Sequence, residues 1–329
     1  MRILDAYAHA LPRRYLERVD GLLADSRASD RVRAYHPFLS QTPALAGLPE
    51  RWRDLEGVED YRQILVLGIP PVEELGPPSL CRELAQLAND ELGQLVAAHP
   101  DRFAGFAAGL PLNDVEASLE ELDRAVETLG ALGIQVYSNV GGRPLDDPSY
   151  QPVFARVAEL GRAIWLHPAR ATTSADYETE ASSRFGLWWA LGWPFETSLA
   201  MARLVHSGLF DRHPELPVVA HHGGAMIPFF SERLEPLDAE LASAAAGGSF
   251  VDRFRAFYAD TIIGTPAALR CSIDFFGVDR VLFGTDMPFG GPGVVHEAIA
   301  TLNALELPEA DRAKIFHANA ERVLLRASG

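Results

Sequence analysis

Lysine is almost absent from this chain. Lys314 is the only lysine among 329 residues, and every other basic residue is an arginine. A Schiff-base mechanism needs a lysine amine in the active site, and a carboxylated lysine that bridges two metals needs one at a strand end. Lys314 lies in a stretch typical of a surface helix, so neither chemistry is expected.

Cysteines, basic runs and long apolar runs are also scarce. Cys81 and Cys271 form no CxxC pattern, which predicts two free thiols in a reducing compartment. The chain has a net charge of −16 and no basic cluster, so a nucleic-acid partner is not expected. No secretory signal and no apolar run of membrane-spanning length is present, so we expect a cytoplasmic protein without a membrane partner.

Eight short apolar runs alternate with helical patterns. Hydrophobic residues make up 48% of the chain, enough for a large core. Eight strands alternating with helices predict a (β/α)₈ TIM-type barrel, with an open α/β sheet as the alternative. The predicted strands are 2–6, 63–69, 103–109, 133–137, 163–167, 217–222, 256–261 and 280–284.

The helices between these strands follow the spacing of their leucines and valines. We expect a single barrel domain over 1–329, with 10–60 as an insertion over the barrel mouth. A second long segment, 169–194, carries three tryptophans and is expected to cap the substrate or to form an oligomer interface. The predicted helices are 79–98, 115–132, 149–160, 195–210, 266–276 and 294–305.

Histidines and an aspartate stand at the ends of four predicted strands. His9 ends strand 1, His167 ends strand 5, a His-His pair ends strand 6, and Asp286 follows strand 8. In a parallel barrel these ends share the face that carries the chemistry. Histidine and carboxylate ligands indicate one divalent metal, with Zn²⁺ expected and Mn²⁺ as the alternative.

The motifs at these ends resemble those of the amidohydrolase-related family. They are DxxxH on strand 1, LHP on strand 5, HGG with a later proline on strand 6, and GTDxPF on strand 8. Their order and spacing are similar to the decarboxylase branch typified by aminocarboxymuconate-semialdehyde decarboxylase. The resemblance extends over nearly the whole chain, including the stretches 144–148, 192–198, 258–261 and 319–322.

The resemblance implies roles for individual residues. It implies that His9, His167 and Asp286 hold one metal, and that the strand 6 histidine moves a proton, with help from Asp286. Two candidates exist for that histidine, His221 and His222. The spacing to Pro228 favours His222, and because neighbours on a strand face opposite ways, only one of the two should reach the site.

The same register places Arg233 where the family has an arginine that binds the substrate carboxylate, often in the neighbouring subunit. Arginine can clamp a carboxylate with two parallel hydrogen bonds. The alternative is a solvated helix arginine. Arg51 and Arg53 in the insertion are candidates for a second cation. The family, with this cross-subunit arginine, also implies a homodimer.

Tyr7 departs from the family pattern. Family members carry histidine there, forming HxH with the second histidine, or glutamate. A tyrosine phenol titrates near pH 10 and is a poor metal ligand at neutral pH. We therefore expect Tyr7 to contact the substrate. Two alternatives remain open, namely that Tyr7 binds the metal as a phenolate or that the protein has lost its metal.

Three functions are compatible with this sequence. The first is metal-dependent nonoxidative decarboxylation of a small unsaturated or aromatic carboxylic acid. The second is metal-dependent hydrolysis of a lactone, amide or ester, since related barrels do this with similar ligands. The third is a metal-free or non-catalytic barrel, which is considered because Tyr7 stands where the family has a metal ligand.

Overall fold

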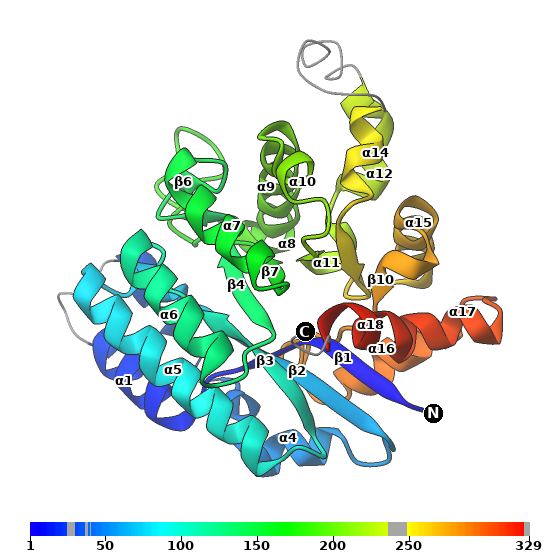
Figure 1. Ribbon diagram of the computed structural model, residues 1–329, viewed down its shortest axis with the longest axis horizontal. Coiled ribbons are helices and arrows are strands. Elements are labelled where there is room, and N and C mark those ends of the chain that lie inside the picture. Colours follow the sequence, from blue (N-terminus) through cyan, green and yellow to red (C-terminus); the bar gives the residue numbers. More distant parts are fainter. Residues whose placement is uncertain (25–29, 37–38, 40, 236–248, 326–329) are drawn as a thin grey trace.

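A computed structural model describes residues 1–24, 30–36, 39, 41–235 and 249–325 (Figure 1). Eight parallel strands form one sheet in the order β1-β2-β3-β4-β7-β8-β9-β10, which is also their order along the chain. The strands are β1 (Ile3–Ala10), β2 (Tyr61–Leu67), β3 (Phe103–Gly109), β4 (Gly133–Tyr137), β7 (Ala163–His167), β8 (Val218–Ala220), β9 (Tyr258–Asp260) and β10 (Val281–Leu282).

The first and last strands meet and close the barrel. The Ala6 amide donates to the Phe283 carbonyl at 2.8 Å, and the Asp286 amide donates to the Tyr7 carbonyl at 3.1 Å. The predicted (β/α)₈ barrel is therefore confirmed, and the open sheet is wrong. The structure differs in the lengths of strands, because β1 runs on to Ala10 while β8 already ends at Ala220.

Helices cover the outside of the barrel (Figure 1). Each predicted helix is present. The helix predicted at 266–276 has these ends, the one predicted at 195–210 is divided into α9 and α10 (Leu209–Arg212), and the others differ by a few residues at their ends. The main helices are α5 (Pro78–Ala98), α6 (Val115–Glu127), α7 (Gln151–Glu159), α9 (Gly192–His206), α12 (Ile227–Leu234), α15 (Pro266–Phe276), α16 (Val294–Asn303) and α18 (Asn319–Leu324).

Two layers of buried side chains hold this architecture. Inside the barrel, Leu4, Ile64, Trp165 and Val219 pack in one cluster, and the Trp165 indole donates to the Ala6 carbonyl at 2.8 Å. A larger cluster lies between the strands and the helices. Fully burying one such aliphatic or aromatic side chain contributes about 1.5–3 kcal/mol, so the filled barrel gives the strand ends a rigid base.

The insertion after β1 contains α1 (Arg13–Ala24), α2 (Asp30–Arg33), a short 3₁₀ turn (Pro43–Leu45) and α4 (Leu48–Asp54). Helix α1 packs beside α5 on the outside of the barrel. The Tyr35 ring contacts Trp188, with centroids 6.3 Å apart, which joins the insertion to the tryptophan-bearing segment.

The expectations for the two cysteines, the single lysine and membrane-spanning segments can be compared with the structure. Cys81 and Cys271 are both free thiols. Lys314 forms ion pairs with Asp279 and Asp311, and Asp279 precedes β10, whereas the histidines stand at the opposite, carboxyl-terminal ends of strands. Within the described part of the chain, no helix is both long and apolar enough to cross a membrane.

Candidate metal centre and active site

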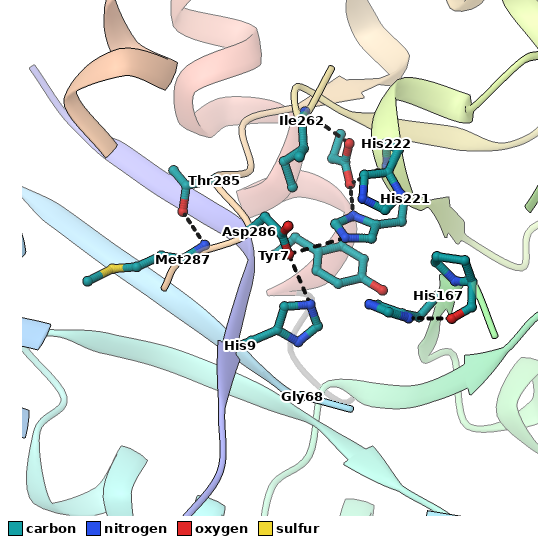
Figure 2. Close-up of polar contacts among 12 residues, drawn as sticks. Tyr7, His9, Gly68, His167, His221, His222, Ile262, Thr285, Asp286 and Met287 are labelled. Atoms are coloured by element: carbon teal, nitrogen blue, oxygen red, sulfur yellow. Dashed lines mark hydrogen bonds and ion pairs between the residues drawn. The ribbon is translucent and has the colours of Figure 1, made fainter. Parts of the chain in front are cut away.

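Strand β1 carries Tyr7 and His9 on the same face, because alternate residues of a strand point the same way. Both side chains are fully buried. The His9 Nδ1 lies 2.9 Å from the Leu67 carbonyl oxygen and donates its hydrogen there. A neutral imidazole that donates from Nδ1 has its lone pair on Nε2. The His9 Nε2 therefore faces the other strand ends as a ligand atom (Figure 2).

His167, the last residue of β7, is held in the same manner. Its Nδ1 lies 2.8 Å from the carbonyl oxygen of the following Pro168, so the Nε2 lone pair is again available. Metal-binding histidines characteristically donate their other ring nitrogen to a carbonyl or carboxylate, which fixes the tautomer and the ring orientation. His9 and His167 both show this arrangement.

The His-His pair lies just beyond β8 in a turn labelled α11 (His221–Gly224). His222 has φ 58° and ψ 49°, the left-handed conformation that bends the chain. The prediction that the two histidines face opposite ways is wrong, because the strand has already ended at Ala220. Their ring centroids lie only 3.8 Å apart, and both side chains reach the site.

Asp260, the last residue of β9, holds this turn. One of its carboxylate oxygens accepts from the His221 Nδ1 at 2.5 Å, and the other accepts from the Gly223 amide at 2.8 Å. Asp260 also accepts from the amide of His222 at 3.2 Å. No role for Asp260 was predicted from the sequence, although Asp260 is a polar residue at a strand end, as His9 and His167 are.

Asp286 completes the ring of polar groups. Its Oδ1 lies 3.1 Å from the His9 Nε2 and 3.4 Å from the His221 Nε2. The preceding Thr285 is fixed by Asp5, whose carboxylate accepts from the Thr285 hydroxyl at 2.6 Å and from its amide at 3.2 Å. Strand β1 therefore positions the segment that carries Asp286.

The donor atoms of this cluster fit a divalent metal. The ligand atoms of His9, His167 and His221 lie within 4.8 Å of one another, as do those of His221, His222 and Asp286. Apart from their contacts with the Asp286 carboxylate, the buried Nε2 atoms of His9 and His221 have no polar partner among the described residues. Nitrogen lone pairs and a carboxylate that converge in a dry site repel one another unless a cation lies between them.

The electrostatics divide the cluster. Burial alone would lower the pKa of His221, but the carboxylates of Asp260 and Asp286 outweigh it and raise that pKa to about 9, so a metal that binds His221 must displace its proton. Burial alone would raise the pKa of Asp286, but the adjacent His221 and His9 hold it well below its usual range, so the carboxylate is charged. Burial and the neighbouring His9 lower the pKa of His167 well below its usual value, so its imidazole is neutral. A charged carboxylate and a neutral imidazole are the forms that bind a metal.

Tyr7 lies inside this ring without joining it. Burial, with the carboxylates of Asp260 and Asp286, raises the pKa of its phenol well above the usual 10, which disfavours a phenolate ligand. The ring is stacked on His221, and the hydroxyl is buried without a hydrogen-bond partner. A protonated, unpartnered hydroxyl can donate to a ligand that arrives in the site.

A largely apolar cavity of about 700 Å³ opens above the cluster. Among the described residues that line it, none is an arginine or a lysine. Arg233 is exposed on α12 outside this cavity, and Arg51 is buried beneath His9, where it donates to the His9 carbonyl. The cavity is lined by Ile69, Trp189, Ala190, Trp193, Pro194, His222, Ala225, Ile262, Ile263, Gly264, Asp286, Phe289 and Gly290.

A closed parallel barrel with imidazoles and a carboxylate at its carboxyl-terminal face defines the class of metal-dependent barrel enzymes. The model of the amidohydrolase family matches residues 72–326. The chain belongs to the amidohydrolase family.

Named relatives indicate the branch. The chain is 35% identical over 285 residues to gamma-resorcylate decarboxylase of Rhizobium sp. (strain MTP-10005). That match covers 82% of this chain and 84% of the relative. It is 34% identical over 215 residues to 2-amino-3-carboxymuconate-6-semialdehyde decarboxylase of Dictyostelium discoideum. That match covers 64% of this chain and 58% of the relative's length.

Solved structures agree over the whole chain. A 5-carboxyvanillate decarboxylase from Sphingomonas paucimobilis superposes with a TM-score of 0.84 at 25% identity, covering 99% of both chains. A dihydroxybenzoic acid decarboxylase from Polaromonas sp. JS666 was solved with bound manganese and the inhibitor 2-nitroresorcinol. It superposes with a TM-score of 0.77 at 29% identity, covering 99% of this chain and 98% of that one.

These comparisons confirm three predictions, namely the amidohydrolase-related family, the barrel and an enzyme of the decarboxylase branch. A divalent metal is supported by the donor cluster and by the manganese in the Polaromonas structure.

Proposed function

We propose that this protein catalyses the metal-dependent nonoxidative decarboxylation of an aromatic carboxylic acid. The observation that carries the proposal is the position of the His-Asp cluster at the floor of an apolar cavity lined by aromatic side chains. Such a site can hold a planar ring while its carboxylate meets the polar floor.

The predicted ligands His9, His167 and Asp286 would hold the metal, and their fixed tautomers and charge suit that role. When bound, a divalent cation neutralises the negative charge of substrate oxygens and orients them. Three imidazole or carboxylate donors suit Zn²⁺, and Mn²⁺ also accepts this set. The manganese bound to the Polaromonas relative makes Mn²⁺ the first ion to test.

The upper part of the cavity selects for a flat, apolar ring. Trp189, Trp193 and Phe289 line it, and the Trp193 ring is roughly parallel to the His222 imidazole, with centroids 6.2 Å apart. Aromatic pairs favour offset stacking or edge contacts at such distances. Tyr7 is fully buried and is not among the described lining residues, so its hydroxyl would donate only to a substrate group that enters the donor cluster itself.

His222 is placed to move the proton. It lines the cavity beside Asp286. The ring carbon that bears the carboxylate takes a proton from His222, the bond to the carboxyl carbon then breaks, its electron pair returns to the ring, and CO₂ leaves. Burial, with the neighbouring His221, lowers the pKa of His222 to about 3. A bound anionic substrate opposes this shift because it stabilises the imidazolium.

We also propose a cytoplasmic homodimer. The two free thiols suit a reducing compartment. Exposed apolar side chains occur at Phe185, Leu191 and Phe195, in the same stretch of chain as Trp189 and Trp193, which line the cavity. Exposed apolar groups concentrated in one region mark contact sites. In such a dimer Arg233, exposed on α12, would supply to the partner's cavity the carboxylate-binding cation that the described lining lacks.

The test is product analysis with the metal-loaded enzyme. Dihydroxybenzoates and related aromatic acids would be incubated with protein loaded with Mn²⁺ or Zn²⁺, and CO₂ and the decarboxylated ring would be quantified. We expect CO₂ and arene in equal amounts, and a loss of turnover of about 10²-fold or more in His222→Asn. Opening of a lactone, amide or ester without CO₂ would instead support the hydrolase.

A further inference from the structure

His221 occupies the centre of the donor cluster. Two groups of donors lie within 4.8 Å of one another, and His221 belongs to both of them. Its Nε2 lies 3.4 Å from the Asp286 Oδ1, which is in turn 3.1 Å from the His9 Nε2. A cation that contacts His9, His167 and Asp286 therefore lies within reach of His221 as well.

The neighbours of His221 hold it as a ligand is held. Its Nδ1 is bound to the Asp260 carboxylate at 2.5 Å, and both side chains are fully buried. This is the carboxylate–histidine arrangement that orients an imidazole towards a metal and raises its basicity. The Tyr7 ring covers one face of the imidazole, with centroids 4.0 Å apart and planes 12° apart, so the ring cannot turn away.

His221 and His222 differ in their access to the cavity. Asp286 and His222 line the cavity, whereas His221 is 0% exposed and is not among the described lining residues. A proton donor must touch the substrate. The buried His222 Nδ1 has no hydrogen-bond partner. In a metal-binding histidine, the ring nitrogen that does not contact the metal almost always donates a hydrogen bond.

We propose that His221 is a metal ligand that replaces the one missing at Tyr7, and that the adjacent His222 is thereby left as the proton donor. The coordinating set is then His9, His167, His221 and Asp286. The assignment rests on the proposed function for the role of His222, whereas the ligand role of His221 stands on the donor geometry. It departs from the sequence-based expectation that only one of the two histidines reaches the site.

Metal titration separates the two histidines. The full chain, stripped with a chelator, would be titrated with Mn²⁺ and Zn²⁺ by calorimetry, and with Co²⁺ by visible absorption. Even the loss of a supporting residue typically weakens metal affinity about 10–100-fold. We therefore expect His221→Asn to weaken affinity by at least that factor and to change the Co²⁺ spectrum. His222→Asn should bind each metal within about threefold of the parent while it loses turnover.

A second variant provides a rescue. Tyr7 lies two residues before His9 on the same strand face and stacks on His221, so Tyr7→His introduces an imidazole at the missing position. We expect the double variant Tyr7→His/His221→Asn to regain at least tenfold in affinity over His221→Asn. Thermal unfolding of the stripped proteins shows whether each variant is folded, and asparagine retains an N–H that can donate to Asp260.

The outcomes are distinguishable. If His221→Asn binds metal as the parent does, or if His222→Asn loses metal as strongly as His221→Asn, the ligand assignment is wrong. Failure of the double variant to regain affinity, with the stripped protein folded, also contradicts it. Absence of CO₂ from every aromatic acid tested would contradict the proposed function alone, because the titration does not depend on turnover.

Discussion

The phenol of Tyr7 lies flat on the imidazole of His221, with ring centroids 4.0 Å apart and planes 12° apart. The stack fills the space at the foot of the cluster and leaves the phenol hydroxyl without a partner. The packing and the hydrogen-bonding capacity of Tyr7 are therefore separable by substitution.

Tyr7→Phe keeps the stack and removes only the hydroxyl. If that hydroxyl donates to substrate, KM should rise about two- to tenfold, the effect of one hydrogen bond of about 0.5–1.5 kcal/mol. The stripped protein should unfold at the same temperature or a higher one, since a buried unpaired group is lost. Steady-state kinetics and thermal unfolding measure both. An unchanged KM would show that the hydroxyl does not contact substrate.

Asp260→Asn should weaken metal binding without removing a ligand. Asp260 accepts from the His221 Nδ1 and from the backbone of the turn that follows, and asparagine cannot reproduce all of these contacts. We expect a loss of about 10–100-fold in metal affinity, measured by calorimetry. Asp274→Asn, at an exposed position on α15, is the matched control and should bind metal normally. Equal affinities in both variants would contradict the prediction.

Arg51→Met should lower the free energy of unfolding, because Arg51 is buried beneath the donor cluster. The Arg51 side chain is buried and donates to the His9 carbonyl and to the Gln63 amide oxygen, at 3.1 Å for the latter. Each acceptor left without a partner costs about 1–3 kcal/mol. Chemical unfolding should show a loss of about 2 kcal/mol or more. Arg53→Met, at an exposed position of the same helix, should change stability by less than about 0.5 kcal/mol.

Glu73 should make stability fall as the pH rises. Burial raises the pKa of Glu73 from 4.5 to about 8, and its Oε1 has no hydrogen-bond partner. Between these pH values the folded state binds more protons than the unfolded state, so stability decreases towards pH 8. Glu73→Gln removes this contribution and should gain on the order of 3 kcal/mol over the parent at pH 7. Urea unfolding at pH 5, 7 and 8 measures the free energy of unfolding. In Glu74→Gln this free energy should change with pH as it does in the parent.

The left-handed backbone of His222 can be separated from its side chain. A non-glycine residue at φ 58° costs about 1 kcal/mol more than glycine does. His222→Gly and His222→Ala should both lose turnover, while the glycine variant should be the more stable by about that amount. Denaturant unfolding of the two variants gives the difference. Equal stabilities would mean that the turn carries no strain at this position.

The sequence predicted the barrel well because its strands are fully buried apolar runs bounded by Gly, Pro or polar residues. It identified His9, His167 and Asp286 as strand-end groups for the same reason. It failed at His221 and His222, where the backbone is bent by Asp260, a residue 39 positions further along the chain. It predicted that segment 169–194 caps the substrate or forms an oligomer interface, and Trp189 and Trp193 of that segment do line the cavity. It did not predict the shape of the cavity, because the packing of these side chains against Phe289 follows from no local pattern.

The bond between Asp5 and Thr285 joins positions 280 residues apart, and His9 meets Asp286 beside it. During translation His9 and His167 emerge from the ribosome long before Asp286 does. The complete coordination shell therefore cannot form until Asp286 has left the ribosome and the closing contacts between β1 and the segment after β10 have formed.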